Sequence, residues 1–191
     1  MYKHLLLSIV LSITVLSAYA TPSWKINSKG GIEWKIEKGQ LPHKDHIEMS
    51  GEQMAFVLRW GIDANGALDL ERSLVFPLLR TIPNNTHASL MHRFATDVIS
   101  LVSVNGRSLQ NENTRLVEID GMFRSISEFG GGIEVERVIF PSVDKPFMCE
   151  RYVFKNTNKR ASTIYVPDFI QKHVTLPEKG VDGAYLLQAS I

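Results

Sequence analysis

Hydrophobic and polar residues alternate along almost the whole chain, and this period of two constrains the fold more than any other feature. Stretch 53–63 is the clearest case, because five apolar side chains share one phase: Met54, Phe56, Leu58, Trp60 and Ile62. Successive side chains of a β-strand point to opposite faces, so this pattern predicts a strand with one buried face. The only window with helical character is 86–94, which could equally be a loop leading into a strand.

A β-hairpin is predicted around Asp63-Ala64-Asn65-Gly66. The stretch 67–76 follows with Leu68, Leu70, Leu74 and Phe76 in phase, and the Asn-Gly step supplies the positive φ angles that a tight turn needs. Further strands are expected in the windows 31–37, 97–105, 114–119, 121–129, 132–140, 147–156, 162–169 and 183–190. Clusters of Gly, Pro, Asn and Asp separate these windows. We therefore expect an all-β protein built as a large antiparallel β-sandwich.

Residues 1–20 predict a signal peptide. Lys3 precedes an apolar run that closes with Ala18-Tyr19-Ala20, the small-x-small pattern of a cleavage site. We therefore expect export to the periplasm or the extracellular space and release from the membrane. Residues 21–191 would form the β-sandwich. Because 183–191 ends in an apolar strand pattern without a polar tail, the domain is expected to be incomplete at its C-terminus, as part of a longer enzyme.

Charge and cysteine content exclude several classes of function. After removal of Lys3 with the signal peptide, 20 basic residues face 20 acidic ones, which argues against nucleic acid or an anionic membrane as partner. Cys149 is the single cysteine, so it cannot form an internal disulfide. Its strand context predicts a buried, inert thiol rather than a nucleophile.

The stretch HKDHIEMSG, residues 43–51, resembles the start of a metal site. Residues three apart on a strand point to opposite faces, so His43 and His46 diverge, and we expect neither a metal nor any other cofactor. His46 and Glu48 share a polar face that could contact a sugar or a neighbouring domain. Ile47 and Met49 should face the core.

No residue is predicted to be catalytic. Glu134 and Glu136 lie two apart on one strand face, whereas glycoside hydrolysis needs two carboxyl groups that face each other across a cleft. The glycines 130–132 precede a strand rather than a helix, so a tight connection is expected there instead of a phosphate site. Trp24 and Trp34 could stack on sugars if exposed, but their phase along the chain favours packing in the core.

The stretch 74–94 is the most distinctive candidate for recognition. It leaves a strand at Pro77 and then offers hydrogen-bonding side chains in a loop rich in turn residues: Arg80, Asn84, Asn85, Thr86 and His87. Such a loop on a rigid sheet suits hydroxyl-rich ligands or another domain. The alternative is a loop whose Asn side chains cap its own backbone.

Four stretches carry a resemblance to a known family: HIEMSG, RWGIDANGALDLERSLVFP, LLRTIPNNTHASL and ERYVFKNTNK. Together they resemble the amino-terminal part of exported bacterial six-hairpin glycosidases with an (α/α)6 barrel, of the α-L-rhamnosidase and sugar-phosphorylase kind. The segment 148–166 is similar to a strand of that family that ends in a Lys-Asn turn and hairpins back.

The resemblance implies an antiparallel sandwich that packs on a helical barrel, and a carbohydrate as ligand. The catalytic carboxylates of such enzymes lie in the barrel, so this part would be inactive alone. Residues expected at the rim of a substrate site or at the domain interface are Arg80, Asn84, Asn85, His87, His46 and Glu48. The alternative function is a non-catalytic carbohydrate-binding β-sandwich.

Overall fold

The chain is all-β in the computed structural model, which describes residues 22–37, 39–83, 88–181 and 183–191. The first half contains β1 (Lys25–Ile26), β2 (Ile32–Lys35), β3 (His43–Ser50), β4 (Ala55–Ile62), β5 (Leu68–Arg80), β6 (Ser89–Phe94), the 3-10 helix η1 (Val98–Leu101), β7 (Ser103–Val104) and β8 (Arg107–Ser108). The second half contains β9 (Asn113–Ile119), β10 (Phe123–Phe129), β11 (Ile133–Pro141), β12 (Met148–Asn156), β13 (Ile164–Tyr165), β14 (Ile170–Val174), the 3-10 helix η2 (Pro177–Lys179) and β15 (Leu186–Ser190). The all-β prediction is confirmed.

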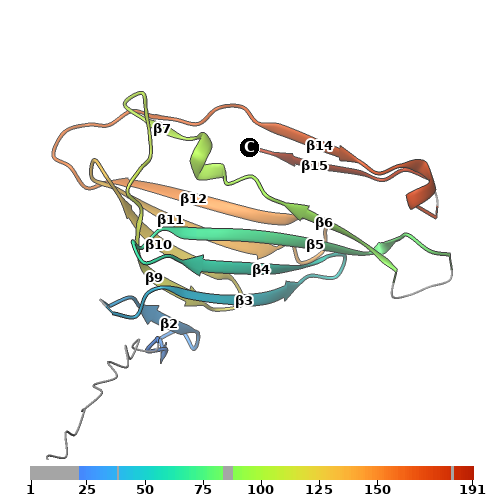
Figure 1. Ribbon diagram of the computed structural model, residues 1–191, viewed down its shortest axis with the longest axis horizontal. Helices are drawn as coiled ribbons and strands as arrows, with labels where there is room; N and C mark the ends of the chain where they lie inside the picture. The colour runs from blue at the N-terminus through green and yellow to red at the C-terminus, as the bar shows by residue number, and fades with distance from the viewer. Residues whose placement is uncertain (1–21, 38, 84–87, 182) are drawn as a thin grey trace, which may run out of the picture.

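Two antiparallel sheets form the body of the molecule (Figure 1). One sheet has the order β3-β4-β5-β6, and the other has the order β1-β2-β9-β10-β11-β12. Neighbouring strands in each sheet are mostly consecutive in the chain, because short turns connect them. The exception is β2, which pairs with β9 and so brings the N-terminal strands into the second sheet.

The inner faces of the two sheets enclose the main hydrophobic core. All five residues predicted to share one face of β4 are at most 2% exposed: Met54, Phe56, Leu58, Trp60 and Ile62. From the opposite sheet Val117, Phe123 and Ile139 complete the cluster with no exposed surface. The alternation in sequence therefore reports correctly which side of each central strand faces the core.

The predicted hairpin at Asp63–Gly66 joins β4 to β5 with Ile62 opposite Leu68. Gly66 adopts φ +93°, and the Asp63 carboxylate accepts hydrogen bonds from the backbone N–H groups of Asn65 and Ala67 at 2.8 and 2.9 Å. Asn65 is not among the described residues with positive φ, so Gly66 alone supplies the left-handed conformation.

Two windows differ from their prediction, and in a third, 86–94, the described residues show the strand of its second alternative. Window 97–105 begins with η1, because the Asp97 carboxylate accepts a hydrogen bond from Ile99 N–H and caps the helix; only Ser103–Val104 is a strand. Window 162–169 is reduced to the two residues of β13, which pairs with β7 rather than hairpinning back onto β12. Within 86–94, the residues Ser89–Phe94 form strand β6 and no helix.

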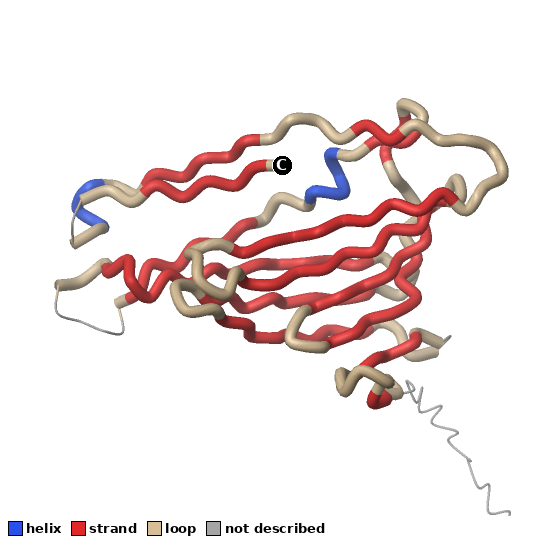
Figure 2. The backbone as a smooth tube through the Cα atoms, turned by 180° about the vertical axis from the view of Figure 1, so that it is seen from behind, coloured by secondary structure: helices blue, strands red, loops and turns tan. Residues whose placement is uncertain are grey.

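The C-terminal strands β14 and β15 form a separate two-stranded hairpin. In two opposite views the hairpin lies along the edge of the sandwich where β6 and β12 are found (Figures 1 and 2). It is anchored to the body through Tyr185 and Leu187, which pack against the main core. The space between the hairpin and this edge forms the candidate site.

Candidate functional site

A buried ion pair connects the two sheets beside the candidate site. Arg72 of β5 has no exposed side-chain surface, and its guanidinium forms a bidentate pair with the Glu150 carboxylate of β12. The Nη2–Oε2 distance is 3.0 Å. Burial by itself lowers the pKa of Arg72, but the charge and hydrogen bonds of Glu150 more than compensate and leave this pKa raised. Arg72 is therefore a permanent cation held by one carboxylate.

The Tyr152 hydroxyl also donates a hydrogen bond to Glu150. Burial, together with the charge of Glu150, raises the pKa of Tyr152, so its hydroxyl keeps its proton. A second interior pair lies between Arg137, which is 1% exposed, and Glu112 at 2.6 Å. The inner faces of the sandwich thus contain two guanidinium–carboxylate pairs next to the apolar core.

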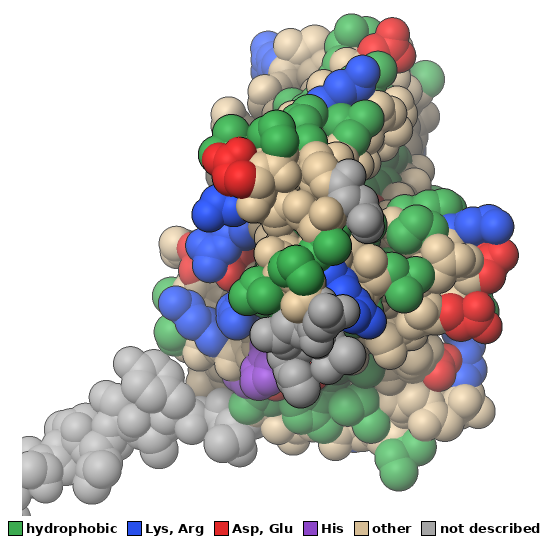
Figure 3. All heavy atoms as spheres, turned by 90° about the vertical axis from the view of Figure 1, so that its right-hand side faces the viewer, with side chains coloured by type: hydrophobic (Ala, Val, Ile, Leu, Met, Phe, Trp, Pro, Cys, Tyr) green, Lys and Arg blue, Asp and Glu red, His purple; other side chains and the backbone are tan. Residues whose placement is uncertain are grey.

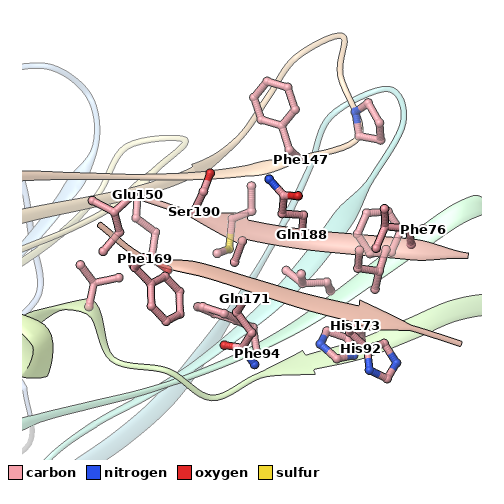
Figure 4. Close-up of a pocket in the computed structure, with 18 of the residues that line it drawn as sticks. Phe76, His92, Phe94, Phe147, Glu150, Phe169, Gln171, His173, Gln188 and Ser190 are labelled. Atoms are coloured by element: carbon pink, nitrogen blue, oxygen red, sulfur yellow. The ribbon is translucent and has the colours of Figure 1, made fainter. Parts of the chain in front are cut away.

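A cavity of about 500 Å³ lies between the sandwich edge and the β14–β15 hairpin (Figure 4). Four phenylalanines line it from different elements: Phe76 of β5, Phe94 of β6, Phe147 just before β12 and Phe169 just before β14. Its other lining residues are Leu74, His92, Val98, Pro146, Met148, Glu150, Tyr152, Gln171, His173 and Leu186 to Ile191. The cavity combines apolar walls with a small number of polar groups, which is the usual composition of a ligand pocket.

Polar contacts fix the hairpin over this cavity. The Arg80 carbonyl accepts hydrogen bonds from the Tyr185 hydroxyl at 2.7 Å and from the Val181 backbone N–H at 3.1 Å. At the other end of β14 the Thr96 hydroxyl donates to the Gln171 side chain at 2.9 Å. The hairpin is therefore held at both ends, while the cavity lies between them.

Two histidines stack across the boundary between sandwich and hairpin. The ring centroids of His92 in β6 and His173 in β14 are 4.3 Å apart, with 25° between the ring planes (Figure 4). Burial lowers the pKa of His92, and the charge of His173 lowers it further. The stacked pair therefore favours an uncharged His92, which is the form of this side chain at neutral pH.

The predicted recognition residues do not gather in the cavity. His46 and Glu48 lie on β3, the strand at the opposite edge of the four-stranded sheet, and their side chains are directed away from the core. Arg80 ends β5 with an exposed side chain and contributes its carbonyl to the hairpin anchor. Asn84, Asn85 and His87 lie outside the described residues, so their role stays a prediction.

The structure gives the two histidines of the opening motif different surroundings. His43 packs between Trp34 and Trp60, with ring centroids 4.9 and 5.2 Å away, whereas His46 is exposed on the other face of β3. The prediction that the two side chains diverge is confirmed. Among the described residues no group of three His, Cys, Asp or Glu side chains is placed to hold a metal ion.

The carboxylates Glu134 and Glu136 lie on the outer face of the six-stranded sheet, as predicted. Glu134 pairs with Lys155 at 3.2 Å, and Glu136 pairs with Arg124 at 2.7 Å and with Arg151 at 2.9 Å. Each carboxylate is therefore part of a surface ion pair, and Glu136 also lines a shallow pocket together with its partners Arg124 and Arg151.

Cys149 differs in part from its prediction. It is half-buried on the outer face of β12, because the inward phase of this strand belongs to Glu150 and Tyr152. Burial raises the pKa of the Cys149 thiol, which keeps it protonated and supports the prediction of an inert side chain.

The tryptophans belong to the core and not to a sugar-binding platform. Trp34 has no exposed surface, and its indole N–H donates to the Gln40 side chain at 2.8 Å. Trp24 is half-buried against both other indoles, with centroid distances of 6.0 Å to Trp34 and 6.4 Å to Trp60. The sequence prediction of core packing is confirmed.

The interior ion pair was missed in the sequence, although a signal was present. Arg72 occupies the same phase as Leu70 and Leu74, and Glu150 occupies the same phase as Met148 and Tyr152. An opposite pair of charges at core-facing positions of two strands predicts a buried ion pair, because an isolated buried charge is too costly.

Comparisons with known proteins do not assign the chain to a family. No protein-family model matches it, and no match was found among characterised proteins or solved structures. Within the described residues, no helix has the length and hydrophobicity needed to cross a membrane.

Proposed function

We propose that this chain is the β-sandwich domain of an exported glycoside hydrolase, whose catalytic carboxylates belong to a helical barrel outside residues 1–191. The observation that carries the proposal is the apolar surface of the C-terminal hairpin region. Ile170, Val174 and Leu176 are 66, 60 and 59% exposed, and several groups of hydrophobic side chains lie on this end of the molecule, with charged side chains between them (Figure 3). Such a surface is typical of one that another domain covers.

The carboxylates that line the cavity support a cavity without its own hydrolytic pair. Two carboxyl groups, about 5–10 Å apart across the substrate, are needed for glycoside hydrolysis. Among the described residues that line the cavity, Glu150 is the only acidic one, and Arg72 and Tyr152 already occupy its oxygens. The signal-peptide pattern of residues 1–20 and the resemblance of the motifs support the exported glycosidase class.

The test compares the mature chain with a longer polypeptide that includes whatever the same gene region encodes downstream. We expect several hundred residues of helical hairpins there, hydrolysis of aryl glycosides by the longer polypeptide only, and slower amide hydrogen exchange in β14 and β15 when the barrel is present. Turnover by residues 21–191 alone, or a downstream sequence without helical hairpins, contradicts the proposal.

The cavity favours a second candidate, a carbohydrate-binding sandwich that acts without a barrel. Both candidates share the ligand class and differ in the need for a second domain. Two measurements together distinguish the two candidates: affinity electrophoresis of the mature chain in gels with different polysaccharides, and amide hydrogen exchange in β14 and β15. Retardation by one polysaccharide, with no protected partner surface on the hairpin, favours the second candidate.

A further inference from the structure

The cavity between the sandwich edge and the β14–β15 hairpin has the size of a small-molecule site. Its volume of about 500 Å³ lies within the usual range of about 300–1,000 Å³ for ligand pockets. Elements far apart in the sequence build it, and the contacts of Tyr185 and Gln171 hold the hairpin in place. The cavity is therefore already present in the folded chain without a ligand, and its shape depends on how the hairpin packs against the sandwich.

The walls of the cavity offer flat apolar surface from several directions. Phe76 and Phe94 come from the sandwich, and Phe169 comes from the segment that leads into β14 (Figure 4). Phe147 lies on the side where Gln188 and Ser190 are found (Figure 4). An aromatic plane packs well against the apolar face of a sugar ring, and the gain comes from removing both surfaces from water.

The charge of the cavity is balanced by the protein itself. Glu150 is the only Asp, Glu, Lys or Arg among the described lining residues, and it is paired with the buried Arg72. His92 is uncharged at neutral pH, because burial and the charge of His173 lower its pKa. A charged ligand would lose its hydration without gaining an unpaired counter-charge, so the cavity favours a neutral ligand.

The polar groups suit hydroxyl groups on such a ligand. Gln171 lies on the hairpin face that also carries His173 and Leu187, and its amide offers both a donor and an acceptor, whereas Gln188 and Ser190 lie on the opposite face with Lys172 and Ile170. The rings of His92 and His173 lie at the same boundary. Hydroxyl groups can donate and accept at once, so they match amides and hydroxyls in either orientation. A ring compound with hydroxyls at its edge and apolar faces fits both the walls and the polar groups.

We propose that this cavity binds one neutral sugar ring, with a face against the phenylalanines and its hydroxyls on the Gln171 amide. The choice of a sugar among neutral hydroxylated rings rests on the proposed function. The site lies beside the exposed hairpin surface formed by Ile170, Val174 and Leu176, so it would hold part of a glycan next to the proposed partner domain.

The test is an NMR titration of the ¹⁵N-labelled mature chain with neutral sugars, namely glucose, galactose, xylose and rhamnose, and with charged glucuronate and glucosamine. We expect shift changes confined to β5, β6, β12 and residues 169–191, with at least one neutral sugar binding more tightly than both charged ones. Phe169→Ala should weaken binding about tenfold through loss of stacking. Gln171→Ala should weaken it about threefold to tenfold through loss of a hydrogen bond.

Gln110→Ala is the matched control, because Gln110 is exposed and does not line the cavity; its affinity should equal that of the unchanged chain. Gln171 is exposed as well, so its variant keeps the test valid if Phe169→Ala unfolds. Binding that is insensitive to Gln171→Ala, binding elsewhere, a preference for a charged sugar, or no shift at millimolar concentration each overturns the cavity proposal. These results leave the glycosidase proposal intact, since that depends on the activity of the longer polypeptide.

Discussion

Arg72 and Glu150 are 78 positions apart in the sequence and form a bidentate ion pair that joins the two sheets of the sandwich. Arg72 has no exposed side-chain surface, and Glu150 has 10%. The pair lies beside the cavity, because Glu150 lines it while Arg72 lies behind the carboxylate. The charge of Glu150 at the cavity wall is thus compensated by Arg72, and the position of the pair depends on both sheets.

Breaking this pair should destabilise the fold more than removing it. Glu150→Gln leaves the Arg72 charge buried without a counter-charge, and we expect a loss of about 3–5 kcal/mol in the free energy of unfolding. The double variant Arg72→Met, Glu150→Leu removes both charges and should lie close to the unchanged chain. Urea unfolding followed by circular dichroism measures both. Equal losses in the single and double variants would contradict the uncompensated charge of Arg72 as the cause of the destabilisation.

Acidification should weaken the fold through His92. Its pKa in the folded chain is below the usual 6.5 because of burial and the charge of His173. Above pH 6.5 neither state binds a proton at His92, so its contribution to stability is fully present. As the pH falls below 6.5, the unfolded state binds the proton first, and stability is lost until the folded pKa is passed.

The urea concentration at the midpoint of unfolding should therefore fall as the pH is lowered from neutral to about 5. His92→Gln should reduce the slope of this midpoint against pH. His46→Gln is the matched control, because His46 is exposed at the far edge of the sheet. A slope that is the same in His92→Gln and in His46→Gln would rule out His92 as its origin.

The turn between β4 and β5 should not tolerate a side chain at Gly66. Its φ of +93° favours glycine, and an added Cβ would lie 2.7 Å from Asn113 Oδ1. We expect Gly66→Ala to cost about 1–3 kcal/mol in thermal or urea unfolding. Gly106→Ala separates the backbone strain from the clash with Asn113, since Gly106 has φ +74° but no atom within 4 Å of its Cβ position. If both variants lose equally, the clash with Asn113 contributes nothing.

Trp34 should act on stability and not on ligand binding. Its side chain is fully buried beside Trp24 and Trp60, so Trp34→Ala should cost about 3–5 kcal/mol by leaving a hole in the core. Trp34→Phe retains part of the packing and should cost less. Tyr165→Ala, at an exposed position, is the control for a lost aromatic ring. Selective loss of sugar binding in a folded Trp34→Phe variant would contradict this assignment.

The strands of the sandwich were predictable because their signal is local. Alternation in 53–63 identifies the buried side of β4, and the turn residues at Asp63–Gly66 fix where the chain reverses. The window 97–105 shows the limit of such reasoning. Its apolar residues fit a strand, but the cap from Asp97 to Ile99 N–H favours one turn of 3-10 helix.

The candidate site could be predicted only in part. The sequence predicts that the Arg80 side chain takes part in recognition, but in the structure the Arg80 backbone carbonyl anchors Tyr185. A pattern of side chains gives no information about such a backbone contact. Phe76, Phe94 and Phe169 appear in sequence as ordinary apolar positions. Only the packing of the hairpin beside β5 and β6 makes them the walls of one cavity.

Local patterns in the amino-acid sequence are enough to predict the all-β class, the central hairpin, the core role of the tryptophans and the outward position of Glu134 and Glu136. Alternation and turn chemistry operate between neighbouring residues, so they need no knowledge of the rest of the chain. The tertiary structure alone decided that Arg72 meets Glu150, that β13 pairs with β7, and that the β14–β15 hairpin closes a cavity. These three contacts join elements that long stretches of chain separate. A hydrophobic period of two indicates which side of a strand is buried, but it does not indicate which other element packs against that side.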